Sequence, residues 1–310
     1  MKGAMVKKVL KIVCFLLVMA VVGVGVTLLL KSAQIDVLSP KGEIASKERS
    51  LLIFTTVLSL IVVVPVFFML ALFSWKFREG NKKAKYTPDW DSNKFLETIW
   101  WGIPCVIILI LSVITWTSSH ELDPYKPLNS NVAPLRVQVV SLQWKWLFIY
   151  PDEGVASVNL LQIPEKTPIN FTVTSDAPMN SFWIPSLGGQ IYAMSGMSTQ
   201  LHLMADGVGS YKGSSANISG KGFADMNFMV HSSNKADFEA WVQQTKSSSS
   251  ALDASTYAQL AKPAIAAKPS FFKLDGTDLY DTIVMKYMMP EAGMQMDHSD
   301  MKSMSDMEGM

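Results

Sequence analysis

The chain has 310 residues, of which 49% are hydrophobic and only 17% are charged. This composition is too apolar for two ordinary soluble domains, so it disfavours a purely cytosolic protein and places part of the chain in lipid. The 27 lysines and arginines balance 26 aspartates and glutamates, for a net charge of +1. Such a balance gives no electrostatic argument for a nucleic-acid partner.

The chain has two cysteines, Cys14 and Cys105, and both lie inside long apolar runs. The remaining segments therefore offer no thiol of their own. This excludes a disulfide framework or a thiolate metal site built from the polar part of the chain.

The N-terminus has the pattern of an export signal. Lys7, Lys8 and Lys11 precede an uncharged run from Ile12 to Leu30, and a basic start before an apolar core is typical of such signals. The run is also long enough to remain as a membrane span. Residues 1–33 are therefore interpreted as either a signal peptide or a signal anchor.

Two further uncharged runs, at about 51–75 and 98–116, are each long enough to cross the roughly 30 Å of hydrocarbon in a bilayer. They predict a two-helix transmembrane domain over 34–116. The connecting loop, 76–97, is expected on the cytoplasmic side because it contains most of the flanking basic residues, namely Lys76, Arg78, Lys82, Lys83, Lys85 and Lys94. Everything from about residue 117 onward is then expected on the opposite side of the membrane.

Residues 117–232 have the alternating apolar pattern of β-strands, as in Ile169-Phe171-Val173 and Met226-Phe228-Val230. Turn-forming clusters separate these runs, which is typical of an all-β sandwich or barrel. Between Val139 and Leu142 the alternation changes phase. We interpret this change as a β-bulge.

Four aromatic residues, Trp144, Trp146, Phe148 and Tyr150, are predicted to lie on one face of one strand. Core packing is the main interpretation, because aromatic side chains bury large areas. The alternative is a surface that accepts electrons, which would need a redox centre nearby.

The C-terminal part of the chain divides into two segments. Residues 233–290 combine helical spacing with aromatic residues and predict short helices that pack on other elements. Residues 291–310 are mostly Met, Asp, Ser and Gly, and are expected to form a flexible Met-rich tail. Thioethers and the imidazole of His298 can bind Cu(I), so a periplasmic copper-binding or metallochaperone membrane protein stays open as an alternative.

Two segments, Met179–Pro185 and Tyr211–Met226, carry a resemblance to a known family. Together with the predicted two-helix anchor and the Gln143–Trp146 strand, they resemble subunit II of the haem-copper respiratory oxidases. In the cytochrome c oxidases of that family these loops hold a dinuclear copper centre. The resemblance runs from about residue 39 to residue 289 and implies a cupredoxin-like Greek-key β-barrel or sandwich.

The resemblance also implies where the copper ligands would lie. This chain keeps one ligand side chain, the thioether of Met226, whereas mixed-valence copper pairs depend on soft thiolates. The other positions hold Asn180 for the upstream histidine, Ser215 and Ser219 for the two cysteines, Phe223 for the second histidine, and Asn217 at the carbonyl position. We therefore expect no metal site and no redox cofactor in this chain.

A retained scaffold without its ligands looks like the quinol-oxidase branch, the cytochrome bo-type ubiquinol oxidases. The resemblance implies a multi-pass subunit of a bacterial inner-membrane complex, with the large C-terminal domain on the periplasmic side. Haems and copper are then expected in the partner subunit I, which also receives ubiquinol, and membrane lipid and further oxidase subunits are the other partners. Cytochrome c is not expected as a partner, although a cytochrome c oxidase subunit II remains an alternative.

Glu97 lies at the cytoplasmic edge of the third apolar run. The simplest interpretation is a carboxylate favoured by the helix dipole. In the resembling family, a glutamate here lies at the entrance of a proton-uptake channel, so Glu97 is the proton-uptake candidate. His120, His202 and His231 are expected to be structural or surface residues.

Overall fold

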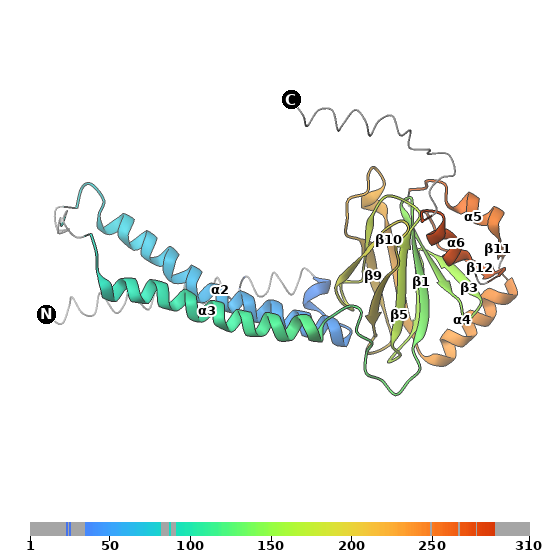
Figure 1. Cartoon of the computed structure of the whole chain (residues 1–310), viewed down its shortest axis with the longest axis horizontal. Helices are drawn as coiled ribbons and strands as arrows, with labels where there is room; N and C mark the ends of the chain where they lie inside the picture. The colour runs from blue at the N-terminus through green and yellow to red at the C-terminus, as the bar shows by residue number, and fades with distance from the viewer. Residues whose placement is uncertain are drawn as a thin grey trace, which may run out of the picture.

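The computed structural model describes residues 35–81, 87, 91–248, 250–265, 267–276 and 278–288, together with Gly23 and Gly25. The expected signal or anchor at 1–33 and the Met-rich tail at 291–310 lie outside these residues, apart from the two glycines, as do Lys82, Lys83 and Lys85 of the connecting loop. A long helical hairpin extends from a two-sheet β domain, which carries short helices on its far side (Figure 1). The expected fold class is confirmed.

The hairpin consists of α2, Glu43–Lys76, and α3, Lys94–Glu121. Both helices are long and apolar enough to cross a membrane. At about 1.5 Å per residue, α2 is about 50 Å long and exceeds the roughly 30 Å of bilayer hydrocarbon. α2 begins and α3 ends at the β domain, whereas their connecting loop lies at the opposite end of the hairpin (Figure 1). This arrangement agrees with a loop and a β domain on opposite sides of a bilayer.

The first turn of α2 is docked directly onto the β domain. The Ala45 backbone N–H donates to the Leu187 carbonyl at 3.1 Å, which satisfies one of the N–H groups that a helix start leaves free. Gly42 permits this close approach, because a Cβ there would lie 2.4 Å from the Met204 carbonyl oxygen. The membrane hairpin and the β domain are therefore joined by backbone contacts, and not only by a linker.

The β domain is a sandwich of two mixed sheets, with strand orders β11-β12-β3-β2-β1-β5-β8 and β4-β10-β9-β6-β7. β1 pairs in parallel with β5, β4 with β10 and β11 with β12, and the other pairs are antiparallel. The strand bounds are β1 Leu135–Leu142, β2 Lys145–Tyr150, β3 Val155–Val158, β4 Leu160–Pro164, β5 Ile169–Ser175, β6 Asn180–Trp183, β7 Gln190–Ala193, β8 Thr199–Leu203, β9 Gly209–Ser215, β10 Asn227–Ser233, β11 Ser250–Leu252 and β12 Ser270–Leu274. Two short 3-10 helices, η1 Asp36–Leu38 and η2 Phe223–Asp225, complete this part of the chain.

The phase change near Leu142 is a hairpin turn, so the prediction of a β-bulge was wrong. β1 and β2 pair antiparallel with Leu142 opposite Lys145, and only Gln143 and Trp144 connect them. Trp144 has a φ of 65°, a left-handed conformation that several tight turns use at this position. A one-residue change in the alternation is expected both from a β-bulge and from a tight hairpin turn. The sequence pattern alone therefore does not distinguish a bulge from a turn.

Trp144 therefore lies in the turn, and three aromatic side chains remain on β2. Trp146, Phe148 and Tyr150 are completely buried between the two sheets. The Trp146 ring lies 5.4 Å from that of Phe182, and the Phe148 ring lies 5.1 Å from that of Phe228. Core packing, the main interpretation of this stripe, is confirmed for these three residues.

The C-terminal segment is part of the β domain. β11 and β12 extend the seven-stranded sheet, and α4, Lys235–Ser248, inserts Phe238 and Val242 into the main core. The expected short helices are present, but the two strands were not predicted. They are short, and β12 is held by its pairing with β3, which is distant in sequence.

Two further helices, α5 Ala254–Leu260 and α6 Leu279–Met285, accompany a second core on the outer face of the same sheet. Tyr280 and Ile283 of α6 pack there in one cluster with Leu147 and Ile149 of β2. Both faces of β2 are therefore buried, which explains why all six of its residues are inaccessible.

Asp176 fastens the C-terminal segment to the sandwich. Its side chain is 2% exposed and accepts hydrogen bonds from Tyr257 Oη at 2.6 Å, Tyr287 Oη at 2.6 Å and Lys286 Nζ at 2.7 Å. Burial opposes ionisation of this carboxyl group, but the three donors outweigh burial and hold the pKa of Asp176 below its usual value. Because the pKa is lowered, the stabilisation is present at neutral pH and is lost as the pH falls through the lowered value.

We predict that Asp176→Asn lowers the free energy of local opening of the C-terminal segment by about 2 kcal/mol at neutral pH, because charge-assisted hydrogen bonds to a buried acceptor are lost. Amide hydrogen exchange of α6 in the intact complex should then accelerate by about 30-fold. Glu239→Gln is the control, since Glu239 is 62% exposed in a 3.9 Å ion pair. Equal exchange in the two variants would contradict the role of Asp176.

Candidate functional site

The candidate site lies where the end of β9 meets the start of β6. Ser215 Oγ donates to Asn180 Oδ1, and the two residues are 7% and 1% exposed. The Ser215 backbone N–H donates to the Met226 carbonyl at 3.1 Å, and Asn217 Nδ2 donates to the Met179 carbonyl at 3.0 Å. The structure thus brings Asn180, Ser215, Asn217 and Met226 together, as their assignment to one site requires.

Ser219 and Phe223 lie further along the same loop. The Ser219 carbonyl accepts a 3.3 Å hydrogen bond from Trp144 Nε1, and Ser219 Oγ is buried with no hydrogen-bond partner among the described residues. Gly222 lies against the Trp144 ring, where a Cβ would come within 2.5 Å of the indole. Phe223 is half-buried and lines a surface pocket with Trp183. The loop therefore rests on the β1–β2 turn.

These side chains do not suit a dinuclear copper centre. The positions that the resemblance assigns to the thiolate and imidazole ligands hold two hydroxyls, an amide and a phenyl ring. The Asn180 and Ser215 side chains also use their oxygens to bind each other. Across the part of the chain that the structure describes, no group of three or more His, Cys, Asp or Glu side chains could hold a metal ion.

Glu97 lies in the first turn of α3 and helps to cap the helix. Its Oε1 accepts a hydrogen bond from the Asn93 backbone N–H at 3.2 Å, and Asn93 Oδ1 accepts one from the Leu96 N–H at 3.1 Å. This reciprocal arrangement satisfies free N–H groups at the helix start. The structure thus places Glu97 in the first turn of α3, where the helix dipole favours a carboxylate, and adds a capping hydrogen bond, at the end of the hairpin away from the β domain (Figure 1).

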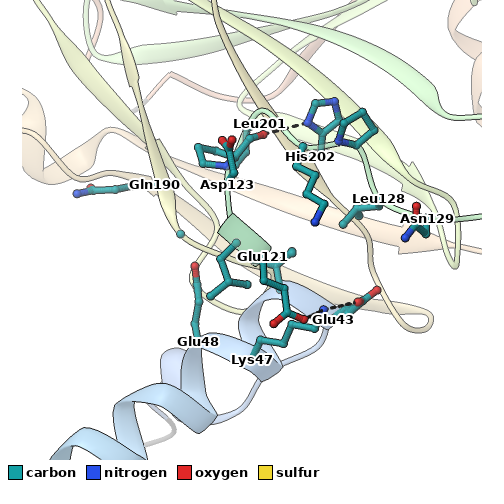
Figure 2. A pocket seen from close by; sticks show the side chains of 16 residues that line it. Glu43, Lys47, Glu48, Glu121, Asp123, Leu128, Asn129, Gln190, Leu201 and His202 are labelled. Atoms are coloured by element: carbon teal, nitrogen blue, oxygen red, sulfur yellow. Dashed lines mark hydrogen bonds and ion pairs between the residues drawn. The ribbon is translucent and has the colours of Figure 1, made fainter. Parts of the chain in front are cut away.

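A second polar site, which the sequence did not predict, lies where the hairpin meets the β domain (Figure 2). Lys47 Nζ lies 2.8 Å from carboxylate oxygens of both Glu43 and Glu121. His202 is 7% exposed, and its Nδ1 lies 2.9 Å from the Pro124 carbonyl oxygen. His202 is therefore structural, as expected.

The signal for this site was present but incomplete. The sequence shows charges immediately before the charge-free run of α2 and immediately after that of α3. Only the antiparallel hairpin brings Lys47 and Glu121 together. If the two spans are assumed to lie antiparallel, the sequence predicts the ion pair between Lys47 and Glu121. It does not predict which β-domain residues surround that pair.

The comparisons with known proteins agree with this architecture. The family described as "Cytochrome C oxidase subunit II, periplasmic domain" matches residues 155–233, and the "COX Aromatic Rich Motif" matches residues 246–291. A cytochrome bo(3) ubiquinol oxidase subunit 2 of Pseudomonas aeruginosa is 47% identical over 260 residues, which are 84% of this chain and 78% of the relative. A ubiquinol oxidase subunit 2 of Acetobacter aceti is 47% identical over 294 residues, which are 92% and 94% of the two chains.

Among solved structures, the periplasmic domain of subunit II of the Bradyrhizobium japonicum cytochrome oxidase aligns with 39% of this chain and 98% of that domain, at 23% identity and a TM-score of 0.37. The sequence relatives are much closer and extend over the hairpin as well. The resemblance drawn from the sequence is confirmed by them. Because this chain is 47% identical to both of these ubiquinol oxidase subunits over most of its length, it belongs to the ubiquinol oxidase subunit 2 family and is part of an oxidoreductase complex.

Proposed function

We propose that this chain is a copper-free subunit of a proton-pumping complex that oxidises ubiquinol and reduces dioxygen to water. The observation that carries the proposal is the hydrogen bond between Ser215 Oγ and Asn180 Oδ1, because it occupies two of the positions where a copper centre would have its ligands. The names of the relatives, which are ubiquinol oxidase subunits, support the choice of quinol as donor.

The loss of copper is consistent with the nature of the donor. A cytochrome c donor stays in the aqueous phase and needs a redox centre in the exported domain. A quinol is lipid-soluble and can reach the catalytic subunit within the bilayer, so a copper port in the β domain is not needed. A working cytochrome c oxidase subunit II would require thiolates in the β domain, and both cysteines lie in apolar runs near the N-terminus and in α3.

The role we propose for this chain is to brace the subunit that holds the haems and the catalytic copper. Large apolar side chains cover the hairpin surface, and Phe67, Trp101 and Leu109 are 66%, 70% and 67% exposed. Such a surface needs lipid or another apolar helix against it. In this proposal the hairpin packs on subunit I in the bacterial inner membrane and the β domain covers its periplasmic face.

We further propose that Glu97 collects protons for uptake into subunit I. It lies at the end of the hairpin away from the β domain, which is the uptake side in this proposal, and it is partly exposed at a helix start. A carboxylate at a membrane boundary is suited to this role. Its capping bond to Asn93 holds the carboxylate at the membrane edge.

Copper content tests the first proposal. Met226→Leu removes the one thioether among the candidate ligands and nearly conserves volume in a residue that is 1% exposed. The copper-to-haem ratio of the purified complex should be unchanged by this substitution, because the copper belongs to subunit I. A lower ratio in the variant would show that the β domain holds copper.

The proton role is tested with Glu97→Gln, which keeps an oxygen able to accept the Asn93 N–H but removes the acid. We expect proton uptake and turnover to fall by about tenfold, or about 1.4 kcal/mol in the barrier. Glu79→Gln is the control, since Glu79 is exposed on the same side of the hairpin. If both variants turn over equally fast, Glu97 is a cap and nothing more.

A further inference from the structure

Two hollows meet where the hairpin joins the β domain. The junction cavity, of about 270 Å³, is bounded by the β-domain ends of α2 and α3 and by β-domain residues that include Gln190 and His202 (Figure 2). The interhelical groove, of about 480 Å³, lies between the two helices and is lined by Leu51, Phe54 and Ile114 among others. Lys47, Glu121 and Leu122 line both, so the polar cavity and the more apolar groove are adjacent, with these three side chains at their common edge.

This pair of hollows lies at the level where the helices enter the apolar layer. Leu51, in the groove, begins the charge-free run of α2, and Lys47 lies one turn before it. Near the same end of α3, Trp116 is 70% exposed and its ring lies 4.6 Å from that of His120. Exposed tryptophans of this kind mark membrane–water interfaces.

The charges around the cavity select for one kind of headgroup. Four acidic side chains line it, Glu43, Glu48, Glu121 and Asp123, against the two basic side chains of Lys47 and Lys126. Lys47 Nζ already binds Glu43 and Glu121, but each carboxylate can accept several hydrogen bonds. The cavity therefore retains acceptors for a cation, and its excess of acids disfavours an anionic headgroup.

We propose that the junction cavity and the interhelical groove together bind one phosphatidylethanolamine molecule of the leaflet facing the β domain. The ammonium group of the lipid would bind the carboxylates of Glu43 and Glu121, which lie on either side of Lys47. Its phosphate would lie beside Lys126 and Lys47, and an acyl chain would follow the groove. The bound lipid would seal the junction between the bilayer and the β domain, whichever electron donor the complex uses.

Lipid binding to the intact oxidase complex, purified through this chain and delipidated in mild detergent, tests the proposal. Native mass spectrometry would follow titration with phosphatidylethanolamine and with phosphatidylglycerol of the same acyl chains. The wild type should bind one phosphatidylethanolamine that phosphatidylglycerol does not displace. The double variant Glu43→Gln, Glu121→Gln should bind it about tenfold more weakly and lose the preference, because charge-assisted hydrogen bonds are removed.

A second variant tests the groove without altering the carboxylates. Ser118→Trp places a bulky side chain in the interhelical groove and should also abolish the tight binding. Glu239→Gln, far out on the β domain, should leave it unchanged. The proposal is overturned if phosphatidylethanolamine binds the double variant or Ser118→Trp as tightly as the wild type. It is equally overturned if the wild type prefers phosphatidylglycerol. Cross-linking from position 118 in the intact complex gives a further test, and the proposal fails if the cross-linker reaches only a protein subunit and no lipid.

Discussion

The docking of the first turn of α2 onto the β domain is the constraint on which the rest of the structure depends. Lys41 and Ala45 donate backbone hydrogen bonds to the carbonyls of Ser186 and Leu187 at 2.7 and 3.1 Å, and the Lys41 carbonyl accepts one from Asp206. These bonds involve the backbone and tolerate little movement, because Gly42 leaves no space for a side chain. They orient the sandwich relative to the membrane helices, and they create the junction cavity between the two.

In the proposed copper-free subunit, the loop from Ser215 to Met226 is held to the sheets without a metal. In a copper centre the ligands would hold the loop to the sheet. Here the hydrogen bond between Ser215 and Asn180 joins the end of β9 to the start of β6, and the Trp144 indole contacts the loop at Ser219 and Gly222. The sandwich itself is held by the aromatic core around Phe182 and Phe228, whose rings stack at 5.3 Å. In this proposal the domain folds around its aromatic core without a metal, and the β domain serves as a cover for subunit I.

The sequence was sufficient for the features that depend on local pattern. The charge-free runs predicted both spans, and alternation at Ile169-Phe171-Val173 predicted β5, because one face of that strand is buried. The sequence could not predict the ion pair between Asp176 and Lys286, since the two residues are 110 apart in the chain. For the candidate site, the loop motifs placed Asn180, Ser215 and Met226 together, but only the fold shows that Asn180 and Ser215 bind each other. The turn at Trp144 was misread because a change of phase has two structural causes.

Oxygen consumption by the complex that co-purifies with this chain in mild detergent tests the account most directly. The complex would be supplied either with ubiquinol or with reduced cytochrome c, under otherwise identical conditions. We predict rapid oxygen uptake with ubiquinol and none with cytochrome c, because the β domain of the proposed copper-free subunit offers no redox centre to a soluble donor. Uptake with cytochrome c would contradict this, and would mean that Ser215 and Ser219 do not stand where we have placed the copper ligands.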